Sequence, residues 1–127
     1  ATHVDVDDRL NPTAIVPVDG TPFDLREPHR LGDLFLDDGW GGVRTVDGVS
    51  AVLRAPDGRE VRLTQDENHG WIQVFTTRDF PTPNGPTLAV AIEPMTAPVN
   101  AFNSGIDLHW LDPGETWTVR WGIQYHR

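Results

Sequence analysis

Glu93 is the residue of this sequence whose position most favours acid–base chemistry. It lies in the apolar run Ala91–Met95, directly before Pro94, and a proline ends strand pairing. A carboxylate partly withdrawn from water at such a place can act as a general base near neutral pH. On spacing alone, a surface glutamate at the end of a strand is the more frequent explanation. The position therefore predicts a general base and leaves that alternative open.

Two polar segments could bind a sugar. In the glycine-rich run Asp37–Trp40, carboxylates stand beside an indole, and aromatic faces stack on sugar C–H groups while carboxylates accept hydroxyl protons. Adjacent side chains diverge, so Asp37 and Asp38 cannot easily bind one hydroxyl together beside Trp40, and a solvated turn explains the run equally well. Asn100 and Asn103 lie in a polar loop after Glu93 and are further candidates for sugar binding. For each asparagine taken singly, formation of a turn is the more frequent role.

Several other chemistries are excluded by composition. The chain has no cysteine and no lysine, which removes disulfides, thiolate nucleophiles, cysteine-bound metals and Schiff bases. Neither serine stands in a nucleophile elbow, and no glycine-rich turn is suited to a nucleotide phosphate. The histidines show no metal-ligand spacing, so we expect neither a metal nor a cofactor. They are His3, His29, His69, His109 and His126.

Charge and length restrict the class of partner. The formal net charge is −9 and the isoelectric point about 4.7, and the arginines are scattered, so neither nucleic acid nor an anionic membrane is an expected partner. No apolar run is long enough to cross a bilayer and no secretory leader is visible, which makes the cytoplasm the expected location. The 127 residues suit one domain, residues 1–127.

The elements that position these residues are expected to be strands. Prolines and glycines recur too often for a long helix, so the predicted fold class is all-β and antiparallel. Val49–Ala55 and Arg59–Thr64 flank Pro56-Asp57-Gly58 and predict a hairpin. Alternation from Thr116 to Tyr125 predicts a half-buried strand.

Two further strands bring Glu93 into the fold. Trp71–Thr77 and Thr87–Glu93 are more continuously apolar, so they are expected to be central strands joined by the loop Phe80–Pro86. This interpretation places Glu93 at the end of a buried strand. The first forty residues are less regular, and Val16–Asp24 predicts extended chain outside any sheet.

Longer runs of the sequence resemble a known family. Leu10–Thr13, Pro17–Arg26 and Leu36–Trp40 are similar, in this order, to the middle section of aldose 1-epimerases. Ala91–Asn103 followed by Leu111–Glu115 resembles the C-terminal block of the same family. The resemblance covers the whole chain. It implies a galactose mutarotase-like β-sandwich, of which this chain would be the C-terminal part.

The resemblance also implies a reaction and roles for particular residues. The family interconverts the α and β anomers of a free aldose by ring opening, without a cofactor, and a histidine protonates the ring oxygen. On matching positions, Glu93 would be the base, Asp37 would bind a sugar hydroxyl and Arg26 would have a structural role. No histidine here matches the family's catalytic ones. The acid is therefore expected on an N-terminal segment or a second chain that completes the sandwich.

Two alternatives remain beside a monosaccharide epimerase. A hexose 6-phosphate 1-epimerase would need converging arginines, for which Arg26, Arg30 and Arg78 are the candidates, and the acidic balance weighs against it. A non-catalytic carbohydrate-binding module is the alternative from another class.

Overall fold

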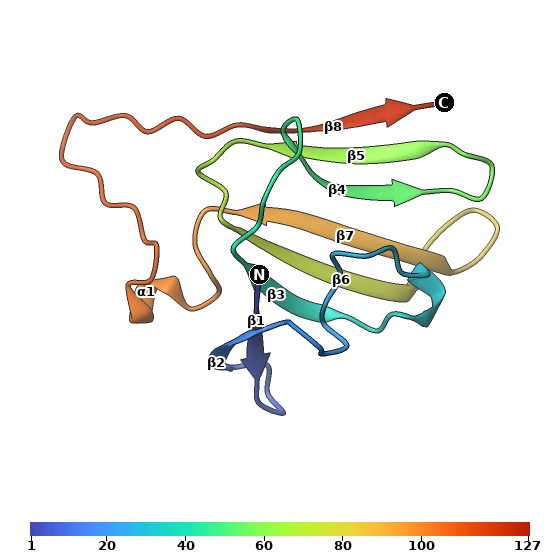
Figure 1. The fold of residues 1–127 in the computed structure, drawn as a ribbon, viewed down its shortest axis with the longest axis horizontal. Coiled ribbons are helices and arrows are strands. Elements are labelled where there is room, and N and C mark those ends of the chain that lie inside the picture. The colour runs from blue at the N-terminus through green and yellow to red at the C-terminus, as the bar shows by residue number, and fades with distance from the viewer.

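The computed structural model describes residues 1–127 as two antiparallel sheets (Figure 1). One sheet has five strands in the order β2-β1-β3-β6-β7, and the other has three in the order β4-β5-β8. The chain is thus all-β, as predicted. The strands are β1 (Thr2–Val6), β2 (Pro12–Pro17), β3 (Asp37–Gly41), β4 (Val49–Arg54), β5 (Glu60–Gln65), β6 (Trp71–Phe80), β7 (Thr87–Met95) and β8 (Trp121–His126), with the short helices η1 (Leu31–Asp33) and α1 (Ala101–Ser104). Neither helix approaches the length that a bilayer-spanning helix needs.

The predicted hairpin is present as β4 and β5. Gly58 has a φ of 89°, a conformation that glycine adopts without steric cost, and the amide of Ala55 donates to the carbonyl of Arg59 over 2.8 Å. The strands then pair through positions such as Leu53 and Val61. The local turn signal was therefore sufficient to define this element.

The strand pair β6 and β7 is also confirmed, but only one of the two strands is central as predicted. β6 lies inside the sheet, between β3 and β7. β7 pairs with β6 alone and forms the edge of the five-stranded sheet, so it is not a central strand. Its apolar character follows from one buried face, because Val90 and Ile92 are only partly exposed while Glu93 is exposed.

The first forty residues contain more sheet than expected. β1 pairs on one side with β2 and on the other with β3. Val16 and Pro17, expected outside any sheet, are therefore the end of a paired strand, whereas the rest of Val16–Asp24 lies outside the sheets as predicted. The Asp37–Gly41 segment, expected to be a loop, is the middle strand of its sheet. Its glycines lower strand propensity, but a Cβ on Gly41 would lie 2.5 Å from Cζ3 of Trp71, so that glycine lets the indole pack against β3.

β8 differs from the predicted half-buried strand. Of the predicted strand Thr116–Tyr125, only the part from Trp121 onward forms a strand, which pairs with β5 and forms the edge of the smaller sheet. Ile123 is opposite Leu63, so it projects from the face that supplies the core, yet its exposed fraction is 67 %. Trp121 and Tyr125 are exposed on the same face. The apolar face of β8 is thus left uncovered by the five-stranded sheet.

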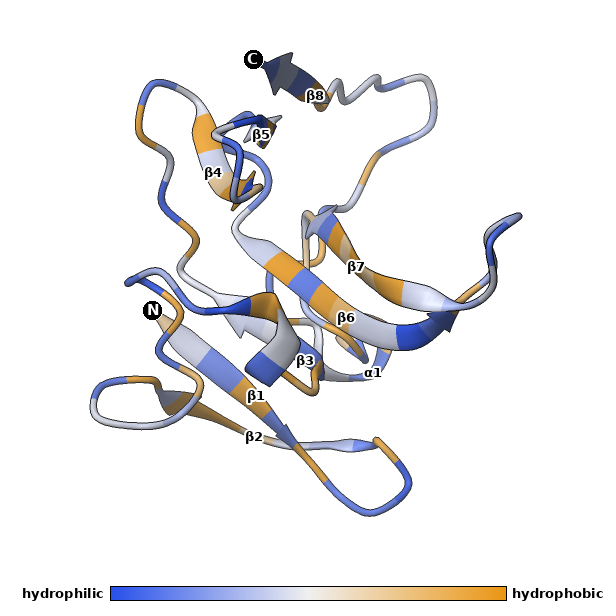
Figure 2. Ribbon diagram, turned by 90° about the vertical axis from the view of Figure 1, so that its right-hand side faces the viewer, coloured by the Kyte–Doolittle hydropathy of each residue, from blue (hydrophilic) through white to orange (hydrophobic).

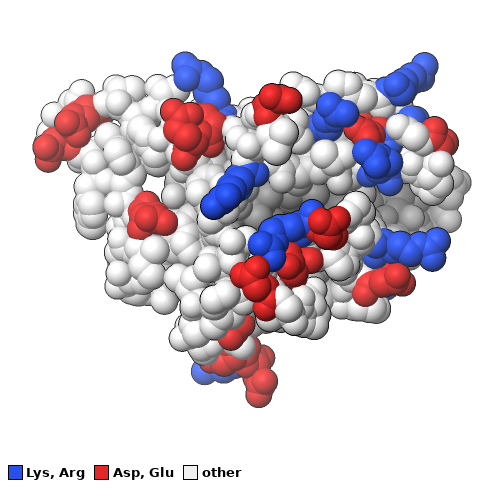
Figure 3. Space-filling view, viewed as in Figure 1, with Lys and Arg blue, Asp and Glu red and all other residues white.

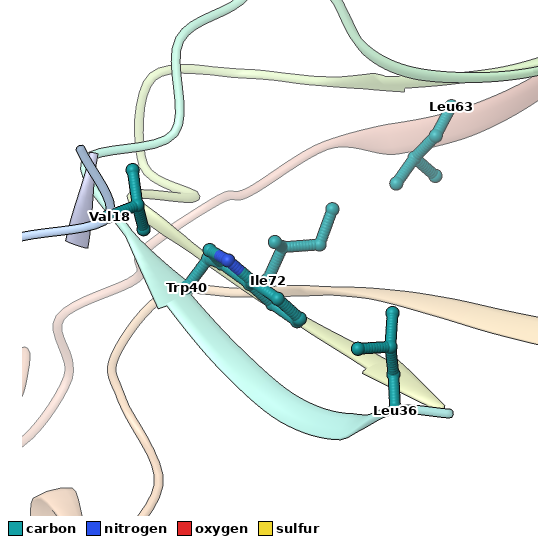
Figure 4. Close-up of a cluster of buried hydrophobic side chains, with 5 residues drawn as sticks. All are labelled: Val18, Leu36, Trp40, Leu63 and Ile72. Atoms are coloured by element: carbon teal, nitrogen blue, oxygen red, sulfur yellow. The ribbon is translucent and has the colours of Figure 1, made fainter. Parts of the chain in front are cut away.

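The core lies between the two sheets. Trp40 and Ile72 from the larger sheet point toward Leu63 of the smaller one, and Val18 and Leu36 close the cluster (Figure 4). Because side chains alternate along a strand, the neighbouring positions point to the opposite face. The alternation of hydrophobic and hydrophilic positions along β6 is visible in Figure 2. The larger sheet therefore has one packed face and one face with polar side chains.

Candidate active site

A row of residues crosses the larger sheet on the face opposite the core. The register pairs Val4 of β1 with Gly39 of β3, Gly39 with Gln73 of β6, and Gln73 with Glu93 of β7. Directly paired residues of antiparallel strands project to the same side of a sheet. Asp37 lies two residues before Gly39 and shares this face. The strand pairing thus brings Asp37, Gln73 and Glu93 onto one surface.

Gln73 connects the members of this row. Its Nε2 donates a hydrogen bond of 3.0 Å to Oδ1 of Asp37. Its Oε1 is buried and has no hydrogen-bond partner, although buried carbonyl oxygens are nearly always bonded. A Cβ on Gly39 would lie 3.1 Å from this oxygen. The absence of a side chain at Gly39 therefore leaves space beside Oε1 of Gln73, where a hydroxyl group could donate a hydrogen bond to this oxygen.

The space beside Gln73 is a hollow of about 120 Å³. Polar groups of Asp37 and Gln73 meet apolar walls there, which is the usual composition of a small-molecule site. Its lining consists of Val4, Val6, Leu10, Asp37, Gly39, Gln73 and Val99.

Glu93 stands beside this hollow in register but outside its lining. It is exposed and forms no hydrogen bond, because β7 is the outermost strand and solvent reaches its side chain. The expected withdrawal from water is therefore not provided by residues 1–127. The carboxylate is therefore open to solvent and to any molecule bound in the hollow.

Trp40 does not face this surface. It projects into the core, where its exposed fraction is 6 %, and its Nε1 donates to the carbonyl of Phe23 over 2.8 Å (Figure 4). An indole with both faces packed and its N–H bonded offers nothing to a sugar. We therefore assign Trp40 to the core, contrary to the prediction, and attribute the error to reading a strand as a loop.

Asn100 and Asn103 lie next to the site in the loop after β7. The Asn103 side-chain amide donates to Oδ1 of Asn100, which has a left-handed backbone with φ 66°. Asn100 also lines a second hollow of about 260 Å³ between this loop and β2, and the two hollows share Val4 and Val99 as walls. The asparagines thus shape the loop and border the site without joining the row.

A tryptophan holds the end of this loop against the sheet. Nε1 of Trp71 donates a hydrogen bond of 2.7 Å to Oδ2 of Asp107. Trp71 is two residues before Gln73 on β6, so both project from the same face. The contact fixes the segment after α1 beside the polar row.

Two of the three arginines that could bind a phosphate, Arg26 and Arg78, are bonded to other groups, whereas Arg30 is exposed and has no side-chain hydrogen bond. Hydrogen bonds to Asp24 and Asp19 raise the pKa of Arg26, and the same guanidinium lowers the pKa of Asp24 to about 2. Arg78 donates to the carbonyls of Gly32 and Leu34. On the face seen in Figure 3, basic and acidic side chains are intermixed.

Gln73 was missed by sequence reasoning. The only local signal was a single polar residue between Ile72 and Val74 in an apolar strand. Its significance depends on its neighbours in β3 and β7, which only the register identifies.

Comparison with known proteins identifies the family of the chain. The aldose 1-epimerase family description matches residues 1–124, and the chain therefore belongs to that family. A more particular relative is the uncharacterised protein YihR of Escherichia coli (strain K12), which is 27 % identical over 110 residues. These residues are 87 % of this chain and 33 % of YihR, so the chain spans about a third of that relative's length. No solved structure matches the chain significantly.

Proposed function

We propose that the protein to which this chain belongs interconverts the α and β anomers of a free aldose, with Glu93 as the general base. The observation that carries the proposal is the register that aligns Glu93 with Gln73 and Asp37 on one face of the sheet. Membership of the aldose 1-epimerase family supports it. The monosaccharide is the proposed ligand of the hollow beside Gln73.

The geometry suggests how the sugar would lie. Asp37 and Glu93 lie two strand spacings apart across the sheet and two residues apart along it, so their backbones are about 12 Å apart. Their side chains would reach a hexose from opposite ends. Oε1 of Gln73 would accept one hydroxyl between them, and Asp37 would accept another. The anomeric hydroxyl would then be directed to Glu93.

The reaction follows from this placement. Glu93 takes the proton of the anomeric hydroxyl, the bond between C1 and the ring oxygen breaks, and its electron pair stays on the ring oxygen, which takes a proton from an acid. Rotation of the aldehyde and the reverse steps give the other anomer. No electron carrier is needed, because nothing is oxidised or reduced.

We propose that the acid comes from a further segment of the protein or from a second chain. The buried histidines here are bonded elsewhere, His3 to Asp38 on the core side and His69 to Asp66. The exposed apolar face of β8 supports a covering segment, because exposed apolar patches mark surfaces that bind another element. The same segment would complete the sandwich and surround Glu93.

Two alternatives are less well supported. A phosphorylated sugar would need several converging guanidinium groups, and of the three candidates those of Arg26 and Arg78 are already bonded, which leaves Arg30 alone. A non-catalytic sugar-binding module would need no base, and Glu93 without a partner would then have no role.

Polarimetry on the complete protein tests the proposal. Glu93→Gln is expected to lower kcat by about 100-fold to 10,000-fold, since the amide keeps the shape but cannot take a proton. The melting temperature should not change, because Glu93 forms no hydrogen bond. Glu67→Gln is the matched control, as Glu67 is also exposed. A near wild-type rate for Glu93→Gln would exclude Glu93 as the base, and sugar binding without anomer exchange by the wild type would favour the binding module.

A further inference from the structure

His3 is a buried histidine held between two carboxylates. Its exposed fraction is 3 %, and its ring stacks on Phe23 with the centroids 3.7 Å apart. Nδ1 lies 2.9 Å from Oδ1 of Asp5, and Nε2 lies 2.9 Å from Oδ1 of Asp38. The edge contact with Trp40 fixes the ring from a further side.

These two contacts place each ring nitrogen of His3 within hydrogen-bond distance of a carboxyl oxygen. An ionised carboxylate can only accept hydrogen bonds, whereas a neutral imidazole has one N–H and therefore donates to one partner. His3 can donate to two ionised partners, Asp5 and Asp38, only when both ring nitrogens carry a proton. Charge-assisted bonds of that kind are stronger than bonds between neutral groups.

A continuous set of hydrogen bonds links His3 to the candidate site on the opposite face. Oδ1 of Asp38 is bonded to His3, while its Oδ2 accepts the backbone N–H of Asp37 over 3.0 Å. The side chain of Asp37 then accepts from Gln73. The carboxylate of Asp38 therefore connects the buried ring to the backbone that carries the proposed hydroxyl acceptor.

We propose that His3, as an imidazolium, is a positioning residue for sugar binding: it holds Asp38, which fixes the backbone at Asp37 from behind the sheet. This inference rests on the proposed function for its kinetic consequence. His3 itself touches no substrate, since it lies on the core face. Its bond to Asp38 supports the site, and its bond to the half-exposed Asp5 fixes the ring in place.

Two substitutions separate this role from a merely structural one. Glutamine can place its amide nitrogen where Nε2 of histidine lies, and asparagine can place its own where Nδ1 lies. His3→Gln therefore keeps a donor for Asp38, and His3→Asn keeps a donor for Asp5. Both variants lose the ring stacked on Phe23, so each is the structural control for the other.

Steady-state kinetics on the complete protein are expected to distinguish the two. His3→Asn should raise KM about tenfold, the low end of what the loss of a hydrogen bond to a charged group costs, with little change in kcat. The KM of His3→Gln should stay within about threefold of the wild-type value. This change is well below the one expected from loss of a hydrogen bond to a charged group. Equal effects of the two variants, or a larger effect of His3→Gln, would overturn the proposal.

A second measurement does not depend on the reaction. Nitrogen-15 spectra of histidine-labelled protein at pH 7 should show both ring nitrogens of His3 protonated, with the signal assigned by its loss in His3→Gln. A neutral tautomer would refute the imidazolium. If the wild type exchanges no anomers, the proposed function fails, and calorimetric sugar affinities of the two variants decide the role of His3 instead.

Discussion

Replacing Gly39 by alanine tests whether the space beside Gln73 is a binding site. The new methyl group would lie 3.1 Å from Oε1 of Gln73 and 3.4 Å from Cγ2 of Val4, inside a hollow of about 120 Å³. Gln73 must then shift by a few tenths of an ångström, and its 3.0 Å bond to Asp37 weakens. Complete loss of a hydrogen bond to a charged group costs about 1.5 to 3 kcal/mol, which corresponds to roughly 10-fold to 150-fold in affinity.

The expected result is a KM about tenfold higher, at the low end of that range because the bond is weakened and not removed. Stability should change by less than about 1 kcal/mol, since alanine is favoured over glycine within a strand and offsets the close contact. Polarimetry and thermal unfolding of the complete protein measure the two quantities.

Gly122→Ala is the matched control. Gly122 also lies in a strand, and its added Cβ would meet Oγ1 of Thr64 at 3.2 Å, in the smaller sheet and away from the polar row. It should leave KM unchanged. A KM for Gly39→Ala within twofold of the wild type would refute the assignment of this hollow as the sugar site.

Three other outcomes are expected. Asp37→Asn should raise KM at least as much as it lowers kcat, because the proposed role of Asp37 is to bind a hydroxyl and not to transfer a proton; a fall in kcat alone would contradict this in steady-state kinetics. Burial opposes ionisation of Asp66, but hydrogen bonds from the Arg120 amide, His69 and Asn68 outweigh it and hold the pKa of Asp66 below its ordinary 3.8. Asp66→Asn should therefore destabilise the fold at pH 7, and in urea titrations the difference should shrink below pH 3.8, as the wild-type carboxylate gains a proton. Residues 1–127 alone should show no anomer exchange and should self-associate through the apolar face of β8, as polarimetry and light scattering would reveal.

The fold was predictable where local chemistry determines it. The turn at Pro56–Gly58 defines the β4–β5 hairpin, and apolar runs define β6 and β7. The central β3 was not predictable from composition, because Gly39 and Gly41 favour a loop. That segment is a strand because β1 and β6 pair with it on both sides and the ring of Trp71 occupies the space above Gly41. Such pairing depends on distant residues.

The site was predictable in part for the same reason. Glu93 and Asp37 came from resemblance to a family, and the register places them on one face. Gln73 carries no motif, and its unpartnered oxygen exists only once β3 and β6 are paired. Trp40 was misassigned to the sugar site because the segment was expected to be a loop. In a strand, side chains alternate between the two faces, and this alternation directs Trp40 into the core.

The separation of packing and polar residues onto opposite faces of one sheet has a consequence for evolution. Positions 37, 39, 73 and 93 can be exchanged one at a time without touching the core, because their neighbours 40, 72 and 92 carry the packing on the other face. Single substitutions at these positions therefore leave the packing of the cluster around Trp40 and Ile72 in place. Gain or loss of one residue within β6 would instead place Gln73 in the core and Ile72 at the surface. Descendants of this gene should accordingly vary more at positions 37 and 39 than in the spacing that separates them from Gln73 and Glu93.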